Sequence, residues 1–270
     1  MTEDLSNYNK EGTILRQAQN RLLEILLEID RICRKHNIPY FINGGNALGA
    51  VRHGGFIPWD DDIDINLKRE DYLKLIKIIE KELPNRFVLQ NRQNEKYLQM
   101  AYSRVVDKDS LCEVEKDKGS YRKHIKHKGL FLDIFFIERG NKKVKKIVDF
   151  FYYRIIYNLT PASSKAKRII ANIGFPFLSL FVYIIRKFNF IFNKNNYVFG
   201  YGIYFKEEFR LDEIYPVKPI TFEGKVVSGP HNIHAYLKRY FGDYMRIPPI
   251  EQRKTHAERI VVYEKDLHST

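Results

Sequence analysis

The sequence predicts an α+β fold, in which a mixed sheet with flanking helices carries an inserted helical segment that is basic and aromatic. Within the first 140 residues, apolar residues recur with helical spacing in some stretches and with the period of two of a strand in others. Between Val144 and Phe192, aromatic residues, Lys and Arg dominate, and Asp149 is the only acid. The 270 residues carry a net charge of +13 and two cysteines, which excludes a disulfide scaffold and indicates an anionic partner.

Helices and strands alternate in the first half of the chain. The apolar spacing predicts, in order, a helix over 13–36, a strand over 40–43, a helix over 47–51, a strand over 62–67, a helix over 70–83, and strands over 87–90, 98–106 and 130–137. Thr13 is the expected N-cap of the first helix, and Pro84 ends the third. Lys116–Lys128 is expected to be a polar, basic loop.

The segment from residue 144 to residue 192 is expected to hold two or three helices. Its longest apolar run, Ile173–Ile185, is expected to be interrupted at Pro176. As a helix the run would be roughly 20 Å long, shorter than the ~30 Å core of a bilayer. A transmembrane helix is therefore not expected, whereas a buried helix and a helix lying at a membrane surface both stay open.

The last third of the chain is expected to contain shorter elements. The pattern predicts extended pieces over 197–209 and 217–227, a turn at Glu223-Gly224, a helix over 233–241 that ends at Gly242, and a last helix over 251–267.

The stretch from residue 41 to residue 67 is the most informative about chemistry. It holds four acids within five positions: Asp60, Asp61, Asp62 and Asp64. On a strand, Asp62 and Asp64 share one face, while Ile63 and Ile65 point into the core. Carboxylates this close repel one another unless a cation lies among them, and oxygen ligands suit Mg²⁺ or Mn²⁺ bound together with substrate phosphates. An acidic cap or a solvated turn is the alternative, but this cluster enters an apolar strand in a basic chain.

Two glycines precede the acids at the join of a strand and a helix. Gly44 and Gly45 would let the backbone approach a phosphate, towards which the N–H groups of a helix start point. Arg52, at the end of the same short helix, either contacts a phosphate or forms a surface salt bridge.

The run GGNALGAVRHGGFIPWDDDIDI closely resembles the signature of the LicD family, which includes fukutin and fukutin-related protein. Asn46 stands where Thr is more usual in that signature. The segment around Asp133, FLDIFF, resembles a second motif, and Tyr240–Met245 with the prolines after it resembles the closing one. The resemblance covers residues 13–137 and 215–256. It implies a nucleotidyltransferase fold and the transfer of a phospho-alcohol from a CDP-linked donor to a glycan, with phosphocholine moved by bacterial relatives and ribitol phosphate by animal ones.

Carried over residue by residue, the resemblance implies that Asp62, Asp64 and Asp133 are catalytic and hold the metal ions. Asp60 and Asp61 would then support these ligands or orient water. Gly44, Gly45 and Asn46 would face the donor. A sugar hydroxyl would attack the phosphorus next to choline in line, CMP would leave, and Asp133 would accept the hydroxyl proton.

Further side chains are candidates for binding the donor. Arg104 could meet phosphate or be a surface strand residue, and Arg253 and His256 could cover the donor or lie on a solvated helix face. Choline, a quaternary ammonium ion, needs an aromatic box. Trp59 lies beside the acids and is either part of such a box or a packing anchor.

A zinc site is not expected. The candidate ligands Cys112, His124 and His127 are loosely spaced and lack an evident fourth partner, so an ordinary basic loop is favoured.

The expected organisation has three parts: residues 1–140 form the nucleotidyltransferase-like catalytic core, 141–196 form the basic aromatic helical segment with possible membrane contact, and 197–270 complete the active site. The N-terminal residues lack the basic and apolar regions of a signal peptide, so the cytoplasm is the expected compartment. The basic segment further indicates a peripheral position at the inner face of the cell membrane.

The expected function is transfer of phosphocholine from CDP-choline to a lipid-linked glycan precursor, of the teichoic acid or lipopolysaccharide type. The first alternative is the same chemistry with CDP-ribitol or CDP-glycerol. A basic nucleic-acid-binding module is the second alternative, but it has no use for the acidic cluster, and no nucleic-acid partner is expected.

Overall fold

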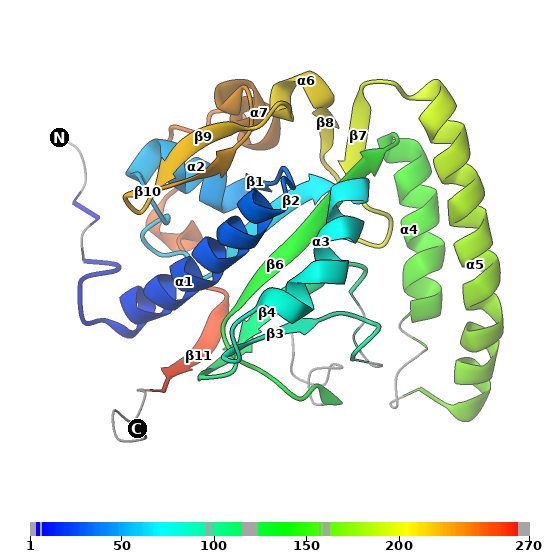
Figure 1. Ribbon diagram of the computed structural model, residues 1–270, viewed down its shortest axis with the longest axis horizontal. Coiled ribbons are helices and arrows are strands. Elements are labelled where there is room, and N and C mark those ends of the chain that lie inside the picture. Colours follow the sequence, from blue (N-terminus) through cyan, green and yellow to red (C-terminus); the bar gives the residue numbers. More distant parts are fainter. Residues whose placement is uncertain are drawn as a thin grey trace.

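A mixed sheet with helices packed against it forms the centre of the molecule (Figure 1), so the predicted α+β class is confirmed. The computed structural model describes residues 4–5, 7–95, 98, 100–114, 124–156, 158 and 163–263. The main strands, in spatial order, are β1 (Phe41–Ile42), β2 (Ile63–Lys68), β6 (Phe131–Arg139), β4 (Ser103–Asp107) and β3 (Phe87–Gln90). β2 and β6 are parallel and the other neighbours antiparallel. β7 (Asn196–Phe199) pairs with the end of β6, and β8 (Glu208–Arg210) pairs with β7.

Two helices, α1 (Ile14–Lys35) and α3 (Arg69–Glu82), lie side by side against the sheet (Figure 1). The predicted cap of α1 is confirmed, because the Thr13 hydroxyl accepts a hydrogen bond from the backbone N–H of Arg16 at 3.3 Å. The apolar face of α1 is fully buried at Leu22, Ile25, Leu26 and Ile29. Each such side chain contributes roughly 1.5–3 kcal/mol to folding, so α1 is a main part of the core.

Helix α2 (Gly44–His53) follows β1 directly and is longer than the predicted 47–51. It begins at the glycine pair itself and ends at Gly54, whose φ of 76° is the left-handed conformation common after a helix. Both glycines therefore lie in the first turn of a helix, beside the acidic stretch that leads into β2.

The middle segment folds into a helical hairpin of α4 (Lys142–Ile156) and α5 (Lys165–Phe192), and α5 is the outermost element at the right of Figure 1. The predicted interruption at Pro176 is wrong, because α5 continues through this residue. The whole helix has 28 residues and is roughly 42 Å long. Among the described residues, α5 is the one helix whose length and composition would allow it to cross a membrane. The buried alternative is also wrong, because only 17% of its most apolar window is covered by the protein.

In the C-terminal third, a predicted turn and a predicted helix are confirmed. The hairpin of β9 (Lys218–Phe222) and β10 (Lys225–Gly229) turns at Glu223-Gly224, and α7 (Ile233–Phe241) ends at Gly242, as predicted. A short helix, α6 (Leu211–Ile214), precedes them.

The predicted helix over 251–267 is wrong. Its described part holds a short 3-10 helix, η3 (Ile250–Gln252), and a strand, β11 (Ala257–Val262), that pairs with β5 (Ser110–Val114). The β-branched residues at 260–262 favour a strand once the edge of β5 is available to pair with. Of the predicted basic loop, residues 116–123 lie outside the described residues.

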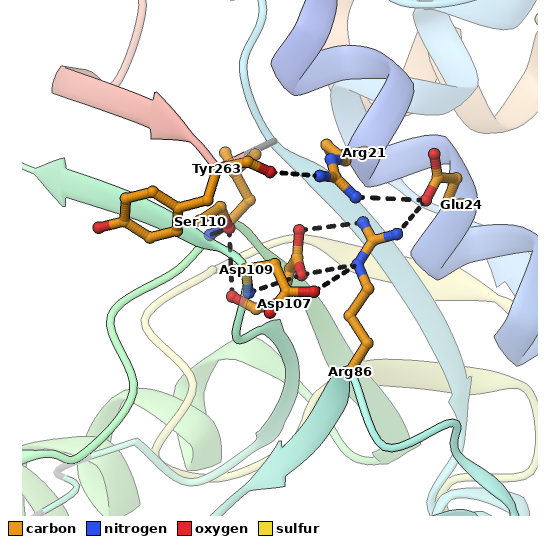
Figure 2. A network of polar contacts seen from close by, with 8 residues as sticks. Arg21, Glu24, Arg86, Asp107, Asp109, Ser110 and Tyr263 are labelled. Carbon is orange, nitrogen blue, oxygen red and sulfur yellow. Dashed lines mark hydrogen bonds and ion pairs between the residues drawn. The ribbon is translucent and has the colours of Figure 1, made fainter. Parts of the chain in front are cut away.

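A polar network joins α1 to three loops at the lower edge of the sheet (Figure 2). The Arg86 guanidinium donates to both carboxylate oxygens of the fully buried Asp107, at 2.9 and 3.1 Å, and to Glu24 on α1 at 2.6 Å. Arg21 donates to the carbonyl of Tyr263 at the end of β11, at 2.9 Å. The network thus fixes the end of β11 against the first helix.

Replacing Asp107 by Ala should lower the free energy of unfolding by about 3 kcal/mol, because the partly buried guanidinium of Arg86 loses its main partner. Glu24 is half-exposed, so Glu24→Ala should cost less than about 1 kcal/mol. Urea denaturation of both variants measures the difference. Equal losses would mean that the buried pair is no more important than the surface one.

Candidate active site

The register of the two parallel strands builds one acidic face. Asp64 on β2 lies directly beside Asp133 on β6, and Arg104 on β4 lies on the other side of Asp133. Residues paired in this way point to the same side of the sheet. On the opposite side, Ile63 and Ile65 are completely buried, as predicted. Residues 64, 133 and 104 therefore come together from three different strands.

Arg104 is bound to protein and does not project towards solvent. Its guanidinium donates to both oxygens of Asp133, at 2.9 and 3.2 Å, and lies 3.7 Å from the ring centre of Phe131. Arg104 is 5% exposed and Asp133 7%. The surface alternative for Arg104 is therefore wrong, and its partner within the protein is the carboxylate of Asp133.

A second group lies next to the acidic face. Ligand atoms of Asp60, Asp62 and His256 are within 4.8 Å of one another, and among the described residues this is the one set arranged for a metal ion. Asp62 is the only member shared with the predicted set. The Nδ1 atom of His256 is 3.7 Å from Asp60 and 3.5 Å from Asp62. Asp60, predicted as a supporting residue, thus lies close enough to Asp62 to share a cation with it. Cys112, His124 and His127 form no such set in the described residues.

The aspartates of the acidic face and of this second group lie close together, and their negative charges affect one another's pKa values. Burial raises the pKa of Asp60, Asp62 and Asp64, and neighbouring carboxylates raise it further, while the charge of His256 opposes the rise at the first two. A hydrogen bond with Asp61, together with the charges of Asp62 and Asp60, raises the pKa of His256 to about 9 despite its partial burial. His256 is therefore an imidazolium at neutral pH.

Asp61 tethers the C-terminal segment. Its carboxylate accepts hydrogen bonds from the backbone N–H groups of His256 at 2.8 Å and Ala257 at 2.7 Å. Burial alone would raise the pKa of Asp61, but these bonds and the His256 ring outweigh it and lower the pKa. Asp61 therefore holds His256 in place.

Asn46 and Gly44, two of the residues predicted to face the donor, form hydrogen bonds within the protein. The Asn46 amide donates to the carbonyl of Asp62 at 3.1 Å and accepts from the N–H of Asp64 at 2.6 Å. The N–H of Gly44 donates to the hydroxyl of Tyr236 at 3.0 Å. Asn46 thus fixes the two acids of the Asp-x-Asp segment relative to each other.

Gly45 lies against the acids themselves. A Cβ atom at this position would be 2.9 Å from a carboxylate oxygen of Asp60, closer than real Cβ atoms approach. Glycine at position 45 is therefore what allows Asp60 to lie beside the start of α2.

Two of the residues predicted to bind the donor, Arg52 and Trp59, contact the C-terminal segment, to which Arg253 belongs. Arg52 donates to the carbonyls of Tyr244 at 3.0 Å and Arg246 at 3.2 Å. Trp59 is 7% exposed, and the guanidinium of Arg253 lies 5.2 Å from its ring centre. Because a cation already covers this ring, the contacts favour the packing role of Trp59 over the predicted choline box.

Two tyrosines that the sequence analysis did not select lie near the acidic face. The pKa of Tyr204 is raised by loss of solvation and then by the charges of Asp64, Asp133 and Asp62. The pKa of Tyr240 is also raised, by burial and then by neighbours that include Asp64 and Tyr204. The ring of Tyr204 is 58% exposed. The closing motif contains Tyr240 and could have indicated it, whereas no motif surrounds Tyr204.

The acidic face is distinct from a cavity of about 550 Å³ elsewhere in the fold. That cavity lies between α3, β6 and α5, and its walls include Tyr72, Phe136 and Leu178. None of the described acids discussed above lines it.

Comparison with known proteins agrees with this geometry. Residues 37–158 match the family described as LicD/FKTN/FKRP, nucleotidyltransferase domain. The chain is 26% identical over 267 residues to the lipopolysaccharide cholinephosphotransferase LicD of Haemophilus influenzae, covering 90% of this chain and 95% of that protein. It is 50% identical over 34 residues to the human ribitol 5-phosphate transferase FKRP, covering 13% of this chain and 7% of that protein. The stretch of the chain that supplies Asp62, Asp64, Asp133 and Arg104 therefore matches the nucleotidyltransferase domain of the LicD family.

Proposed function

We propose that the protein is a metal-dependent phosphotransferase that moves phosphocholine from CDP-choline to a sugar hydroxyl of a lipid-linked glycan precursor, of the teichoic acid or lipopolysaccharide type, and releases CMP. The observation that carries this proposal is the pairing of Asp64 with Asp133 on two parallel strands, with Asp62 close to both just before the first of these strands. Both named relatives transfer a phospho-alcohol, and the one that matches along most of the chain is a cholinephosphotransferase.

The chemistry of the acidic side chains fits a hard divalent cation. Burial and mutual repulsion disfavour the charged forms of Asp60, Asp62 and Asp64, and a bound cation would remove that cost. Asp62, Asp64 and Asp133 would hold Mg²⁺ or Mn²⁺, with Asp60 adjacent. When bound, the ion supplies positive charge that offsets the developing charge on the transferred phosphoryl group and on CMP.

The cationic side chains of the site have separate roles. His256 is charged at neutral pH and lies at the edge of the acidic group, where it can donate a hydrogen bond to a diphosphate oxygen. Arg104 donates to both oxygens of Asp133 and so fixes the orientation of that carboxylate.

The Arg104 pair also bears on which residue accepts the proton of the attacking hydroxyl. A carboxylate that receives two hydrogen bonds from a guanidinium is stabilised in its charged form and is a weaker base. Asp133 is therefore less suited to this role than the sequence analysis expected. Asp64, its neighbour on β2, has no ion-pair partner among the described residues and is partly exposed, so we assign the proton to Asp64.

The exposed ring of Tyr204 favours choline over a polyol. A quaternary ammonium group binds the face of an aromatic ring, and the acids next to the ring add negative potential. Tyr204 and Tyr240 are both near Asp64, where the phosphocholine group would be transferred. Transfer of ribitol or glycerol phosphate is the alternative, and FKRP supports it. Nucleic-acid binding is a weaker alternative, because it leaves the acidic face without a use.

The proposed donor is tested by incubating the purified protein with Mg²⁺, a glycan acceptor and one donor at a time: CDP-choline, CDP-ribitol, CDP-glycerol or CTP. CMP release should be fastest with CDP-choline. Release with CDP-ribitol alone would support the polyol alternative, and tight oligonucleotide binding without any release would support the nucleic-acid one.

Asp62→Asn and Asp64→Asn should each reduce CMP release from CDP-choline by roughly 10²-fold or more, because each removes charge where the phosphoryl group is transferred. EDTA should have the same effect, and Mg²⁺ should reverse it in the unchanged protein. Asp212→Asn is the matched control, since Asp212 is a surface acid whose side chain is 60% exposed. Near-normal turnover by either active-site variant would contradict the assignment.

Tyr204→Ala should raise the KM for CDP-choline roughly tenfold, whereas Tyr204→Phe should change it little, because the ring and not the hydroxyl attracts the ammonium group. The KM for CDP-ribitol, measured with the same variants, should not follow this pattern. Equal loss in Ala and Phe variants would assign the effect to the hydroxyl and argue against an aromatic choline site.

A further inference from the structure

The hairpin of α4 and α5 carries most of the large apolar side chains that are exposed among the described residues. Of 23 such side chains, three lie on α4 and twelve on α5. They are Ile147, Phe150, Phe151, Ile169, Ile170, Ile173, Phe177, Leu180, Phe181, Tyr183, Ile184, Phe188, Phe190, Ile191 and Phe192. Contiguous apolar surface of this kind is uncommon on a soluble monomer and indicates a binding partner.

Exposed apolar side chains of α5 form a stripe on a face of the helix that is turned away from the packed residues. Ile170, Ile173, Phe177, Ile184 and Phe188 follow one another at helical spacing, and each is at least 44% exposed. They run along almost the whole helix. The outer face of α5, defined by this stripe, is therefore long, apolar and open.

The inner face of α5 is fixed to the catalytic part. Leu178 and Val182 are buried against Val148 of α4 and against Tyr201. Asn189 donates to the hydroxyl of Tyr201 at 2.7 Å, and Arg186 pairs with Glu138 at the end of β6. These polar contacts hold α5 on the protein near its C-terminal end.

The charges of the hairpin are almost all positive. Residues 142–192 contain ten Lys and Arg but one acid, Asp149. Asp149 pairs with the buried Lys145 at 2.7 Å. Basic residues stand near both ends of α5, with exposed Lys165 and Lys167 at its start and Lys187 towards its end.

We propose that the outer face of α5 docks on an anionic lipid bilayer, with the helix lying along the membrane surface. The apolar stripe would enter the region between headgroups and acyl chains, and the basic side chains would meet lipid phosphates. A second copy of the chain fits less well, because it would bring two strongly positive hairpins together. The inference is independent of which donor the acidic face binds.

The orientation along the surface follows from the inner face. A helix that crossed the bilayer would have to leave Glu138 and Tyr201 and would expose Arg186 and Asn189 to lipid, which is costly. Lying flat, α5 keeps these contacts and buries only its apolar stripe.

Flotation with vesicles tests the docking. The full chain should float with vesicles that contain phosphatidylglycerol, less so at high salt, and little with phosphatidylcholine alone. The double variant Phe177→Glu, Phe188→Glu should lower the bound fraction roughly tenfold or more. Val226→Glu is the control, since Val226 on β10 is 57% exposed but lies outside the hairpin.

Absence of vesicle binding, or unchanged binding of the double variant, would overturn the proposal. Light scattering without lipid tests whether a second copy of the chain covers the outer face instead. If the protein is a dimer that the double variant dissociates, and if it does not float with vesicles, the outer face is assigned to a second copy. Circular dichroism of each variant confirms that it is folded, and CMP release confirms that the acidic face is intact.

Labelling tests the orientation. Cysteines introduced by Lys165→Cys and Lys194→Cys, one at a time, would report the two ends of α5, because native Cys33 and Cys112 are buried. With protein added to preformed vesicles, both sites should react with a maleimide that cannot cross membranes. Protection of one end until the vesicles are opened would show that α5 crosses the bilayer and would overturn the flat orientation.

Discussion

Electrostatic repulsion among the clustered carboxylates is the constraint on which the candidate site depends. Asp60, Asp61, Asp62 and Asp64 lie within five positions, and without support they would move apart. The side chain of Asn46 fixes the backbone at Asp62 and Asp64, and the Gln19 side chain on α1 donates to the carbonyl of Asp60 at 2.8 Å. Neutral hydrogen bonds from two helices thus hold the acids in position, leaving their charges available to a cation and a substrate.

Strand β6 connects the acidic face to the helical hairpin. Asp133 lies near its start, and Glu138 near its end pairs with Arg186 of α5. The chain then returns from the hairpin as β7 and a loop that leads to Tyr204. Lys145 of α4 donates to two carbonyls of that loop, those of Gly200 and Ile203. The hairpin and the acidic face are therefore parts of one rigid frame, and the position of Tyr204 depends on both.

Local patterns in the sequence predicted those features that depend on neighbouring residues. The N-cap at Thr13 and the burial of Ile63 and Ile65 needed only a few positions of context. The length of α5 did not follow from the sequence, because a proline was expected to end a helix, yet the packing of Leu178 and Val182 supports the turns that follow it. Packing against the rest of the molecule here outweighs a local signal.

Contacts between distant residues could not be predicted in the same way. The apolar residues at 260–262 suited a helix or a strand, and only the open edge of β5 decides between them. Arg52 and Trp59 lie in the signature stretch, and their contacts with residues almost 200 positions later in the chain could not be read from that stretch. Conversely, His256 was placed on a helix, yet a loop brings it to Asp61.

The tether between Asp61 and residues 256–257 has a consequence for how the protein comes to be active during its synthesis. The partners are separated by 195 positions, so the loop that they close can form on the ribosome only after residues 256–257 have been synthesised. Until then the acids lack their imidazolium neighbour, and β5 has an unpaired edge. A nascent chain that has already made its acidic face is thus still without the complete site until residues 256–257 reach Asp61.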